Sequence, residues 1–262
     1  MEAKWGARLF HRLGQRVELT DAGRILADYA ERMAVLTEEA RRVLAEMAGL
    51  QRGYLRLGAS TTPGLYLLPE VAARFQARYP GVEITLAISH SADVARRVLN
   101  AEFDLGFVGA PAEAAGLQVR PFAEDEIILI APPGHVLARS AGRALELFAG
   151  ATLILREAGS GTRELAEAHL MQLGVRPKRT MELPGCEAVK RGVAAGLGVA
   201  FISWRSVTLE VAHNLICAPE IPALRFSRHL YALTRKDARP TAASLAFLAL
   251  VLQDTATTHP TR

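Results

Sequence analysis

Two loops of the sequence combine hydroxyl side chains with glycine in a pattern that suits anion binding. Residues 58–64 have the sequence Gly-Ala-Ser-Thr-Thr-Pro-Gly, and residues 157–163 have the sequence Glu-Ala-Gly-Ser-Gly-Thr-Arg. Each loop follows a predicted strand and precedes a predicted helix. A helix N-terminus attracts anions through its unpaired N–H groups and its positive dipole end, and glycine lets the backbone approach a ligand closely. We therefore expect the two loops to form one site for a small anion.

The hydroxyl groups have a simpler alternative role. Ser60, Thr62, Ser160 and Thr162 are residue types that commonly cap helices, and each of them taken alone fits that role. Their repetition in two equivalent loops favours ligand binding. Arg163 is the charged residue we expect to meet an anion, although a solvated position on the first helical turn is the alternative, and Arg156 is equally open.

Motifs for catalysis and for metal binding are missing from the sequence. There is no G-x-S-x-G elbow and no phosphate-binding G-x-x-x-x-G-K-[ST] loop, and the run from Gly196 to Gly198 lacks the third glycine of a dinucleotide fingerprint. The seven histidines never take the H-E-x-x-H spacing, and Cys186 and Cys217 cannot complete a four-cysteine zinc site. We predict no enzyme, no cofactor and no metal.

The elements that position the two loops form two successive βαβ series, which indicates an α/β fold. The first series has predicted strands at 54–59, 82–88 and 104–109 and helices at 65–78 and 91–101. The second opens with a strand at 126–131 and continues with strands at 152–156, 179–183 and 199–203 and helices at 161–173 and 185–196. A last strand at 226–234 and a helix at 241–254 are predicted to complete the first unit.

This order predicts an effector-type domain over 53–254 with two Rossmann-like lobes. Lobe 1 is expected at 53–123 and 225–254, and lobe 2 at 124–218. The chain should cross between them near 122–126 and near 218–225, where Pro219 and Pro222 suit a linker. Residues 255–262 are expected to be a frayed tail.

Residues 20–52 are predicted to hold a long helix that begins at the N-cap Thr20 and runs to about Gly49. Its apolar residues step alternately by three and four positions, as in a coiled-coil seam, at Leu26, Tyr29, Met33, Leu36, Ala40, Val43 and Met47. The period favours pairing with another chain. Packing on its own domain is the alternative.

Bulk properties exclude some classes of protein. Of the 262 residues 50% are hydrophobic, and no apolar run is long enough for a membrane span or a signal peptide. The two cysteines suit a reducing cytoplasm, where we expect the protein. A balance of 31 basic to 27 acidic residues is too even to argue for nucleic acid unaided.

Two N-terminal segments closely resemble the wing and the following helix start of LysR-type transcriptional regulators. They are residues 6–12, Gly-Ala-Arg-Leu-Phe-His-Arg, and residues 16–23, Arg-Val-Glu-Leu-Thr-Asp-Ala-Gly. Further marks of the family lie at 68–69, 75–82, 104–106, 133–135 and 192–200, so the resemblance covers nearly the whole chain. It implies a winged helix-turn-helix, a dimerising linker helix and a two-lobed domain like that of periplasmic binding proteins.

The same resemblance implies which residues bind the effector. They are Ser60, Thr61, Thr62, Pro63, Val108, Gly109, Ser160, Gly161, Thr162, Arg163 and Phe201. The run 156–163 is most similar to regulators of carbon fixation and sulfur assimilation, which implies a phosphorylated or carboxylated metabolite or an inorganic anion. The family also implies a homodimer or a tetramer.

Residues 1–19 resemble only the last part of the DNA-binding domain. Arg8, Arg12 and Arg16 are expected to contact DNA phosphates, which positions a protein without specifying sequence. Family members carry a recognition helix before Gly6, where this chain has five residues, so we expect an N-terminally truncated domain that binds DNA weakly.

The sequence therefore predicts a ligand-responsive LysR-type regulator that binds a small anion. The alternative is a solute-binding protein of a transporter, which would share the cleft. That class needs an export signal and has no use for a heptad helix.

Overall fold

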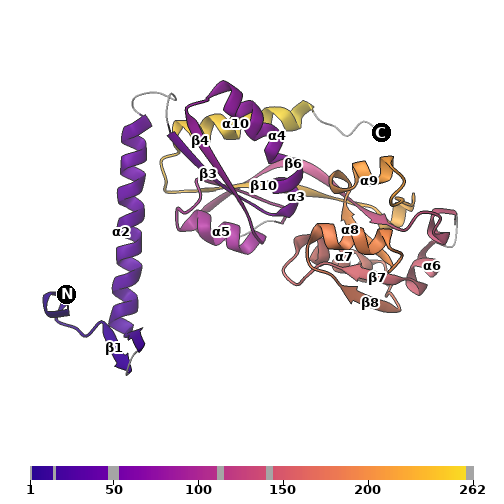
Figure 1. Ribbon diagram of the computed structural model, residues 1–262, viewed down its shortest axis with the longest axis horizontal. Coiled ribbons are helices and arrows are strands. Elements are labelled where there is room, and N and C mark those ends of the chain that lie inside the picture. Colours follow the sequence, from indigo (N-terminus) through magenta and orange to yellow (C-terminus); the bar gives the residue numbers. More distant parts are fainter. Residues whose placement is uncertain (1, 14–15, 47–52, 111–114, 140–143, 258–262) are drawn as a thin grey trace.

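The computed structural model describes residues 2–13, 16–46, 53–110, 115–139 and 144–257. In Figure 1 a hairpin and a long helix stand apart from an elongated α/β domain, to which the rest of the described chain belongs.

The N-terminal elements are α1 (Glu2–Trp5) and the antiparallel pair β1 (Phe10–Leu13) and β2 (Arg16–Leu19). They lead into α2 (Asp21–Glu46), and the Thr20 hydroxyl caps it by accepting the Gly23 N–H at 2.9 Å. That hydroxyl also donates to the carbonyl of Arg8 at 2.6 Å. A Cβ atom on Gly23 would lie 2.0 Å from the carbonyl oxygen of Leu9, so glycine is what lets the preceding chain lie against the helix.

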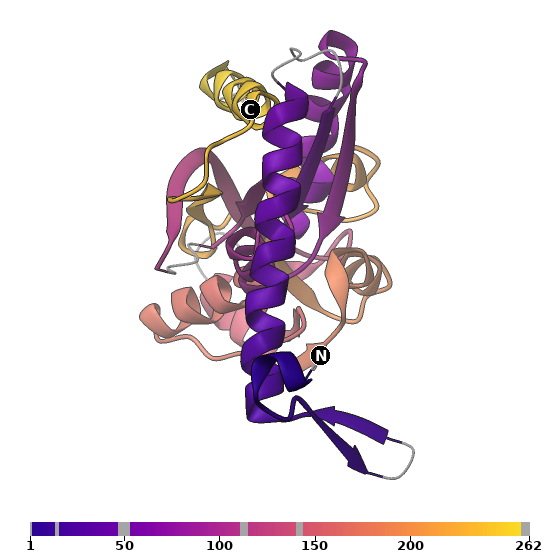
Figure 2. The same ribbon diagram turned by 90° about the vertical axis from the view of Figure 1, so that its left-hand side faces the viewer.

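The seam of α2 is bare along the part whose side chains are described. Tyr29, Met33 and Leu36 are 57%, 68% and 61% exposed, and Leu26 is half-buried. Figures 1 and 2 show the helix running alongside the domain as a separate rod. Tyr29, Met33 and Leu36 therefore do not pack on the domain of their own chain. Ala40 and Val43 continue α2, and Met47 lies outside the described residues.

One sheet of eight strands spans the described part of the domain, in the order β4-β3-β5-β10-β6-β9-β7-β8. The strands are β3 (Gly53–Ala59), β4 (Val82–Ile88), β5 (Leu105–Val108), β6 (Leu117–Ile130), β7 (Thr152–Leu155), β8 (Arg179–Glu182), β9 (Val199–Ser203) and β10 (Phe226–Arg235). Strands β3, β4 and β5 are parallel and belong to what we call lobe 1, and β7, β8 and β9 are parallel and belong to lobe 2. Between them β6 and β10 pair antiparallel.

From either edge inward, the sheet has the second, the first and then the third parallel strand of a lobe, followed by one strand of the central β10/β6 pair. The two halves are therefore related by a pseudo-twofold axis between those strands. The loop after β3 in lobe 1 and the loop after β7 in lobe 2 occupy equivalent positions, at the carboxyl ends of parallel strands where ligands bind in open α/β sheets.

Helices cover the sheet and bury its apolar residues. They are α3 (Thr61–Tyr66), α4 (Leu68–Arg78), α5 (Ser91–Leu99), α6 (Ala144–Gly150), α7 (Gly161–Gln172), α8 (Gly185–Ala194), α9 (Thr208–Ala212) and α10 (Ala242–Thr257). In lobe 1 the ring of Phe247 meets Phe75 and Phe107 edge to face, and in lobe 2 Phe148 meets Phe201 in the same way. Among the described residues no helix combines the length and apolarity that a bilayer crossing requires.

The α/β fold is as predicted, and the largest difference lies at the crossings. Residues 122–126, where a crossing is predicted, are the middle of the 14-residue strand β6, which passes from lobe 1 to lobe 2 and pairs with β10 from Leu117 to Ile127, with a register shift between Leu230 and Tyr231. The charged residues of β6 interrupt the apolar pattern by which a strand is recognised in a sequence. The predicted helix 65–78 is two helices, since the chain breaks at Leu67 (φ −125°), and α10 continues to Thr257.

We predict that the exposed seam of α2 holds two copies of the chain together. The double change Met33→Glu and Leu36→Glu should weaken self-association at least tenfold, because it places charges where apolar side chains would be buried. Light scattering over a dilution series measures the mass. Asp28→Ser, at another exposed position of α2, is the control. An unchanged mass for the double variant at every concentration would exclude the seam as the interface.

Candidate effector-binding site

The two predicted loops meet across the centre of the sheet and enclose a small cleft. Its lining comes from lobe 1 with Ser60, Thr61, Thr62, Ser89, His90, Ser91 and Gly109, from lobe 2 with Arg156, Gly159, Ser160, Gly161 and Thr162, and from β10 with Arg228. The cavity has a volume of about 30 Å³, which is room for an ordered water molecule or two. A larger ligand therefore requires the lobes to separate.

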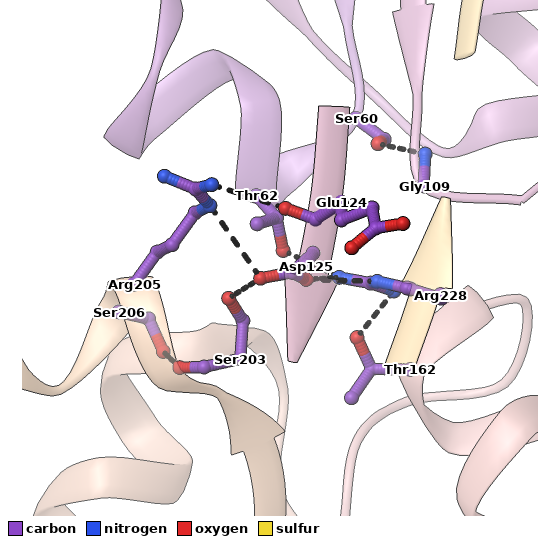
Figure 3. Close-up of polar contacts among 10 residues, drawn as sticks. All are labelled: Ser60, Thr62, Gly109, Glu124, Asp125, Thr162, Ser203, Arg205, Ser206 and Arg228. Carbon is purple, nitrogen blue, oxygen red and sulfur yellow. Dashed lines mark hydrogen bonds and ion pairs between the residues drawn. The ribbon is translucent and has the colours of Figure 1, made fainter. Parts of the chain in front are cut away.

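Arg228 is the centre of this cleft and touches both lobes (Figure 3). Its Nη2 donates to the hydroxyl of Thr62 in lobe 1 at 2.9 Å, and its Nη1 donates to the hydroxyl of Thr162 in lobe 2 at 3.1 Å. The side chain is only 5% exposed. One buried cation thus joins the first turns of α3 and α7.

Asp125 holds Arg228 in place from the side away from the cleft. It lies directly opposite Arg228 in the β6/β10 register, and its carboxylate accepts the Arg228 Nε–H at 2.9 Å. The same carboxylate accepts the hydroxyl of Ser203 at 2.6 Å and is fully buried. Arg205 Nε lies 3.8 Å from the same carboxylate. Because an unpaired buried charge is very unfavourable, the Arg228 guanidinium requires Asp125 as its anionic partner.

The serines at the two helix starts do not act as caps. Ser60 and Ser160 occupy the N-cap positions of α3 and α7, and neither side chain makes a capping hydrogen bond. The Ser60 hydroxyl instead accepts the N–H of Gly109 at 3.0 Å, which fixes the end of β5 to the loop after β3. A Cβ atom on Gly109 would lie 3.1 Å from Nη1 of Arg228, so glycine makes room for the guanidinium.

Arg156 brings a second guanidinium to the cleft and is also buried. It makes a two-pronged pair with Glu157, from Nε at 2.9 Å and from Nη2 at 2.6 Å. These hydrogen bonds, together with one from the N–H of Gly185, lower the pKa of Glu157 to about 2. The carboxylate therefore stays ionised and orients Arg156.

Four predicted effector residues lie elsewhere. Pro63 is buried at the third position of α3, Val108 belongs to the core of lobe 1, and Phe201 belongs to the core of lobe 2. The side chain of Arg163 turns outward: Nη1 donates to Glu182 at 2.6 Å and to the carbonyl of Arg156 at 2.9 Å, and Nε donates to Glu167. It braces the loop from outside instead of meeting a ligand.

Ser60, Thr61, Thr62, Gly109, Ser160, Gly161 and Thr162 do line the cleft, with five residues that the sequence did not single out as ligands: Ser89, His90, Ser91, Gly159 and Arg228. Arg228 had one available signal. It is a charged residue inside a strand predicted from its apolar neighbours, and such a residue in a buried strand needs a specific partner.

A second contact between the lobes lies at Tyr66, the last residue of α3. Its hydroxyl is 3.7 Å from the sulfur of Cys186 on α8, and its ring packs among apolar residues of lobe 2. Burial raises the pKa of Tyr66, so the phenol stays protonated. The lobes are thus joined at the cleft and on one flank.

The lining favours an anion over a metal ion or a cation. Two guanidinium groups face the cavity, and no carboxylate is among the described residues that line it. His, Cys, Asp and Glu side chains of the described residues form no cluster of three that could hold a metal ion. Two lobes, a central hinge pair and a polar cleft define an effector-binding domain of the periplasmic-binding-protein type.

Comparisons with known proteins agree with this class. Residues 48–256 match the LysR substrate binding domain. The chain is 30% identical over 243 residues to the HTH-type transcriptional activator CmpR of Synechocystis, which covers 93% of this chain and 80% of that protein. It is 30% identical over 259 residues to the RuBisCO operon transcriptional regulator of Allochromatium vinosum, covering 99% and 85%.

A solved structure, the CcmR regulatory domain of Synechocystis in complex with 2-PG, has a TM-score of 0.70 and 28% identity and covers 77% of this chain and 97% of its own. The chain belongs to the LysR family. It is a ligand-responsive transcriptional regulator and neither an enzyme nor the solute-binding protein of a transporter.

Removal of the Asp125 carboxylate should destabilise the fold, because Arg228 would lose its buried anionic partner. We expect Asp125→Asn to lower the free energy of unfolding by about 3–5 kcal/mol, the usual effect of breaking a buried ion pair. Glu126→Gln is the matched control: it disrupts the neighbouring pair with Arg225, whose side chains are 34% and 33% exposed, and it should cost less than about 1 kcal/mol. Urea denaturation measures both, and equal losses would contradict the central role of Asp125.

The lowered pKa of Glu157 predicts a dependence of stability on pH. Its contribution is complete above the ordinary pKa of 4.5 and is lost as the pH falls toward 2. The stability difference between the wild type and Glu157→Gln should therefore shrink over that interval. Thermal denaturation at a series of pH values tests this, with Glu164→Gln reporting the loss of an exposed charge. A difference that does not change with pH would be the opposing result.

Proposed function

We propose that the cleft binds a small oxyanion, either an inorganic anion or the phosphate or carboxylate group of a metabolite, and that this ligand sets the angle between the lobes. The observation that supports this most directly is the position of Arg228, which donates to a threonine hydroxyl of each lobe at once. The ligand contacts proposed are Ser60, Thr61, Thr62, Gly109, Ser160, Gly161 and Thr162 with Arg156 and Arg228.

The charge of the site supports an anion. Both guanidinium groups are buried and oriented by carboxylates behind them, so they meet a ligand without first being ordered. The backbone of α7 begins at Gly161, whose unpaired N–H groups add to the positive potential. The bound 2-PG (2-phosphoglycolate) of the CcmR regulatory domain is an anion of the proposed kind.

We further propose that the signal leaves the domain through β3. This strand begins at Gly53, after the segment that follows α2, and ends at Ala59, next to Ser60 of the cleft. A rigid strand between the linker and the effector loop lets a change in the cleft alter the angle of α2. Two α2 helices paired along the seam would form a dimer, and pairs of dimers a tetramer.

We also propose that the hairpin of β1 and β2 contacts DNA. Arg12 lies on β1, Arg16 lies on β2, and Arg8 precedes them as an exposed residue. Contacts of these arginines to DNA phosphates would be strongly salt-dependent and independent of sequence.

The cleft hypothesis predicts specific stabilisation by anions. Sulfate and 2-phosphoglycolate should raise the melting temperature of the wild-type chain, since a ligand at one hundred times its Kd adds about 2.7 kcal/mol. The double variant Thr62→Val and Thr162→Val, which keeps side-chain size and removes both hydroxyls, should bind at least tenfold more weakly. Thermal-shift titration measures this.

Thr85→Val is the control, because Thr85 is an exposed threonine of β4 outside the cleft. Full stabilisation of the double variant by both anions would place the ligand elsewhere.

A further inference from the structure

We infer that the cleft selects oxyanions that carry no proton, so that sulfate and phosphate monoester dianions bind and monohydrogen phosphate is rejected. This inference rests on the proposed function, because it concerns the anionic group that the cleft would hold. It follows from which groups of the cleft can donate a hydrogen bond and which can accept one.

The threonine hydroxyls of the cleft are turned into donors by Arg228. A guanidinium group has five N–H donors and no acceptor, so the oxygens of Thr62 and Thr162 must be the acceptors in their contacts with it. The single hydrogen of each hydroxyl therefore points away from Arg228. It is available to a ligand oxygen.

Ser60 is set in the same way by a different group. Its oxygen accepts the backbone N–H of Gly109 at 3.0 Å, and an N–H group cannot accept in return. Three hydroxyls around the cavity, one from lobe 2 and two from lobe 1, thus each accept a hydrogen bond from a fixed donor, which engages one of the two lone pairs of each oxygen. Each offers its hydrogen outward.

The guanidinium groups add only donors. Arg228 directs one N–H of Nε and one of Nη2 to Asp125, another of Nη2 to Thr62 and one of Nη1 to Thr162, which leaves the second N–H of Nη1 beside Gly109. Arg156 directs Nε and Nη2 to Glu157 and is also part of the cavity lining.

The strong acceptors nearby are turned away from the cavity. Asp125 is held behind Arg228, and Glu157 is engaged by Arg156 and by the N–H of Gly185. The hydroxyl oxygens of Thr61, Ser91 and Ser160 can accept weakly. At the outer edge, the exposed ring of His90 and the hydroxyl of Ser89, which donates its own hydrogen to Asp93 at 2.7 Å, can accept as well. Solvent competes for both.

A ligand hydroxyl in this inner site would meet guanidinium N–H groups and hydroxyl oxygens, which are weak acceptors, and no carboxylate of the described residues lines the cavity to accept its hydrogen. Sulfate and methyl phosphate are dianions without an O–H group, whereas inorganic phosphate at the same charge retains one hydrogen. A hydrogen-bonding group that loses water and gains no partner weakens binding by about tenfold or more. Size and charge are nearly equal for sulfate and monohydrogen phosphate, so the proton decides between them.

The test is a thermal-shift titration of the full chain at about pH 8.5, above the second pKa of phosphate monoesters, and at constant ionic strength. Sulfate and methyl phosphate should bind at least tenfold more tightly than inorganic phosphate. Binding of inorganic phosphate as tight as that of sulfate would overturn the inference.

A pair of variants at Ser160 sharpens the result, because this buried side chain lines the cavity at the start of α7. Ser160→Asp supplies an acceptor and should reduce the preference for sulfate over inorganic phosphate at least threefold. Ser160→Ala removes a hydroxyl, which is both a donor and a weak acceptor, and adds no carboxylate, so it should weaken both anions and leave the preference nearly unchanged. An equal preference in the two variants would count against the inference.

Failure of the inference differs from failure of the proposed function. If all three anions bind equally and the Thr62→Val, Thr162→Val variant loses them, the cleft is the anion site and only the selection by proton is wrong. If no anion stabilises the wild-type chain, both proposals are wrong.

Discussion

The ion pair between Arg228 and Asp125 is the contact on which the two-lobed arrangement depends. It joins directly opposite residues of β10 and β6, the two strands that cross between the lobes, and it is nearly inaccessible to water. Because neither ion can be left alone in the interior, the register of these strands is fixed where the pseudo-twofold axis passes. The Arg228 guanidinium, held in place by Asp125, then donates to one hydroxyl of each lobe.

The contacts that close the cleft are weaker than the pair behind them. Separation of the lobes requires the loss of one hydrogen bond from Arg228 to Thr62 or Thr162 and of the packing of Tyr66 against lobe 2, while Asp125 keeps its partner. Each hydrogen bond to a charged group contributes about 1.5–3 kcal/mol. An anion that replaces these contacts can therefore shift the ratio of open to closed forms, because its own binding free energy can offset the contacts that are lost.

The fold also determines where such a shift can be sensed. In Figure 1 the long helix α2 stands beside lobe 1, and none of the described residues that line the cleft belongs to it. Strand β3 ends at Ala59, next to Ser60, whose hydroxyl accepts the N–H of Gly109 directly after the neighbouring strand β5. The effector loop and the start of the domain are therefore at the two ends of one strand.

The sequence by itself determined the class of the fold and most of the cleft. Period and composition predicted the strands and helices of both lobes, and the repeated Ser-Thr-Gly loops predicted Ser60, Thr62 and Thr162, because local spacing specifies helix starts. The tertiary structure alone decided that β6 is continuous through its charged residues, since pairing with β10 outweighs local propensity. It alone placed Arg228 in the cleft and turned Arg163 out of it. Those two arginines are distinguished by partners far away in the chain, Asp125 for one and Glu182 for the other, and no local pattern encodes such pairs.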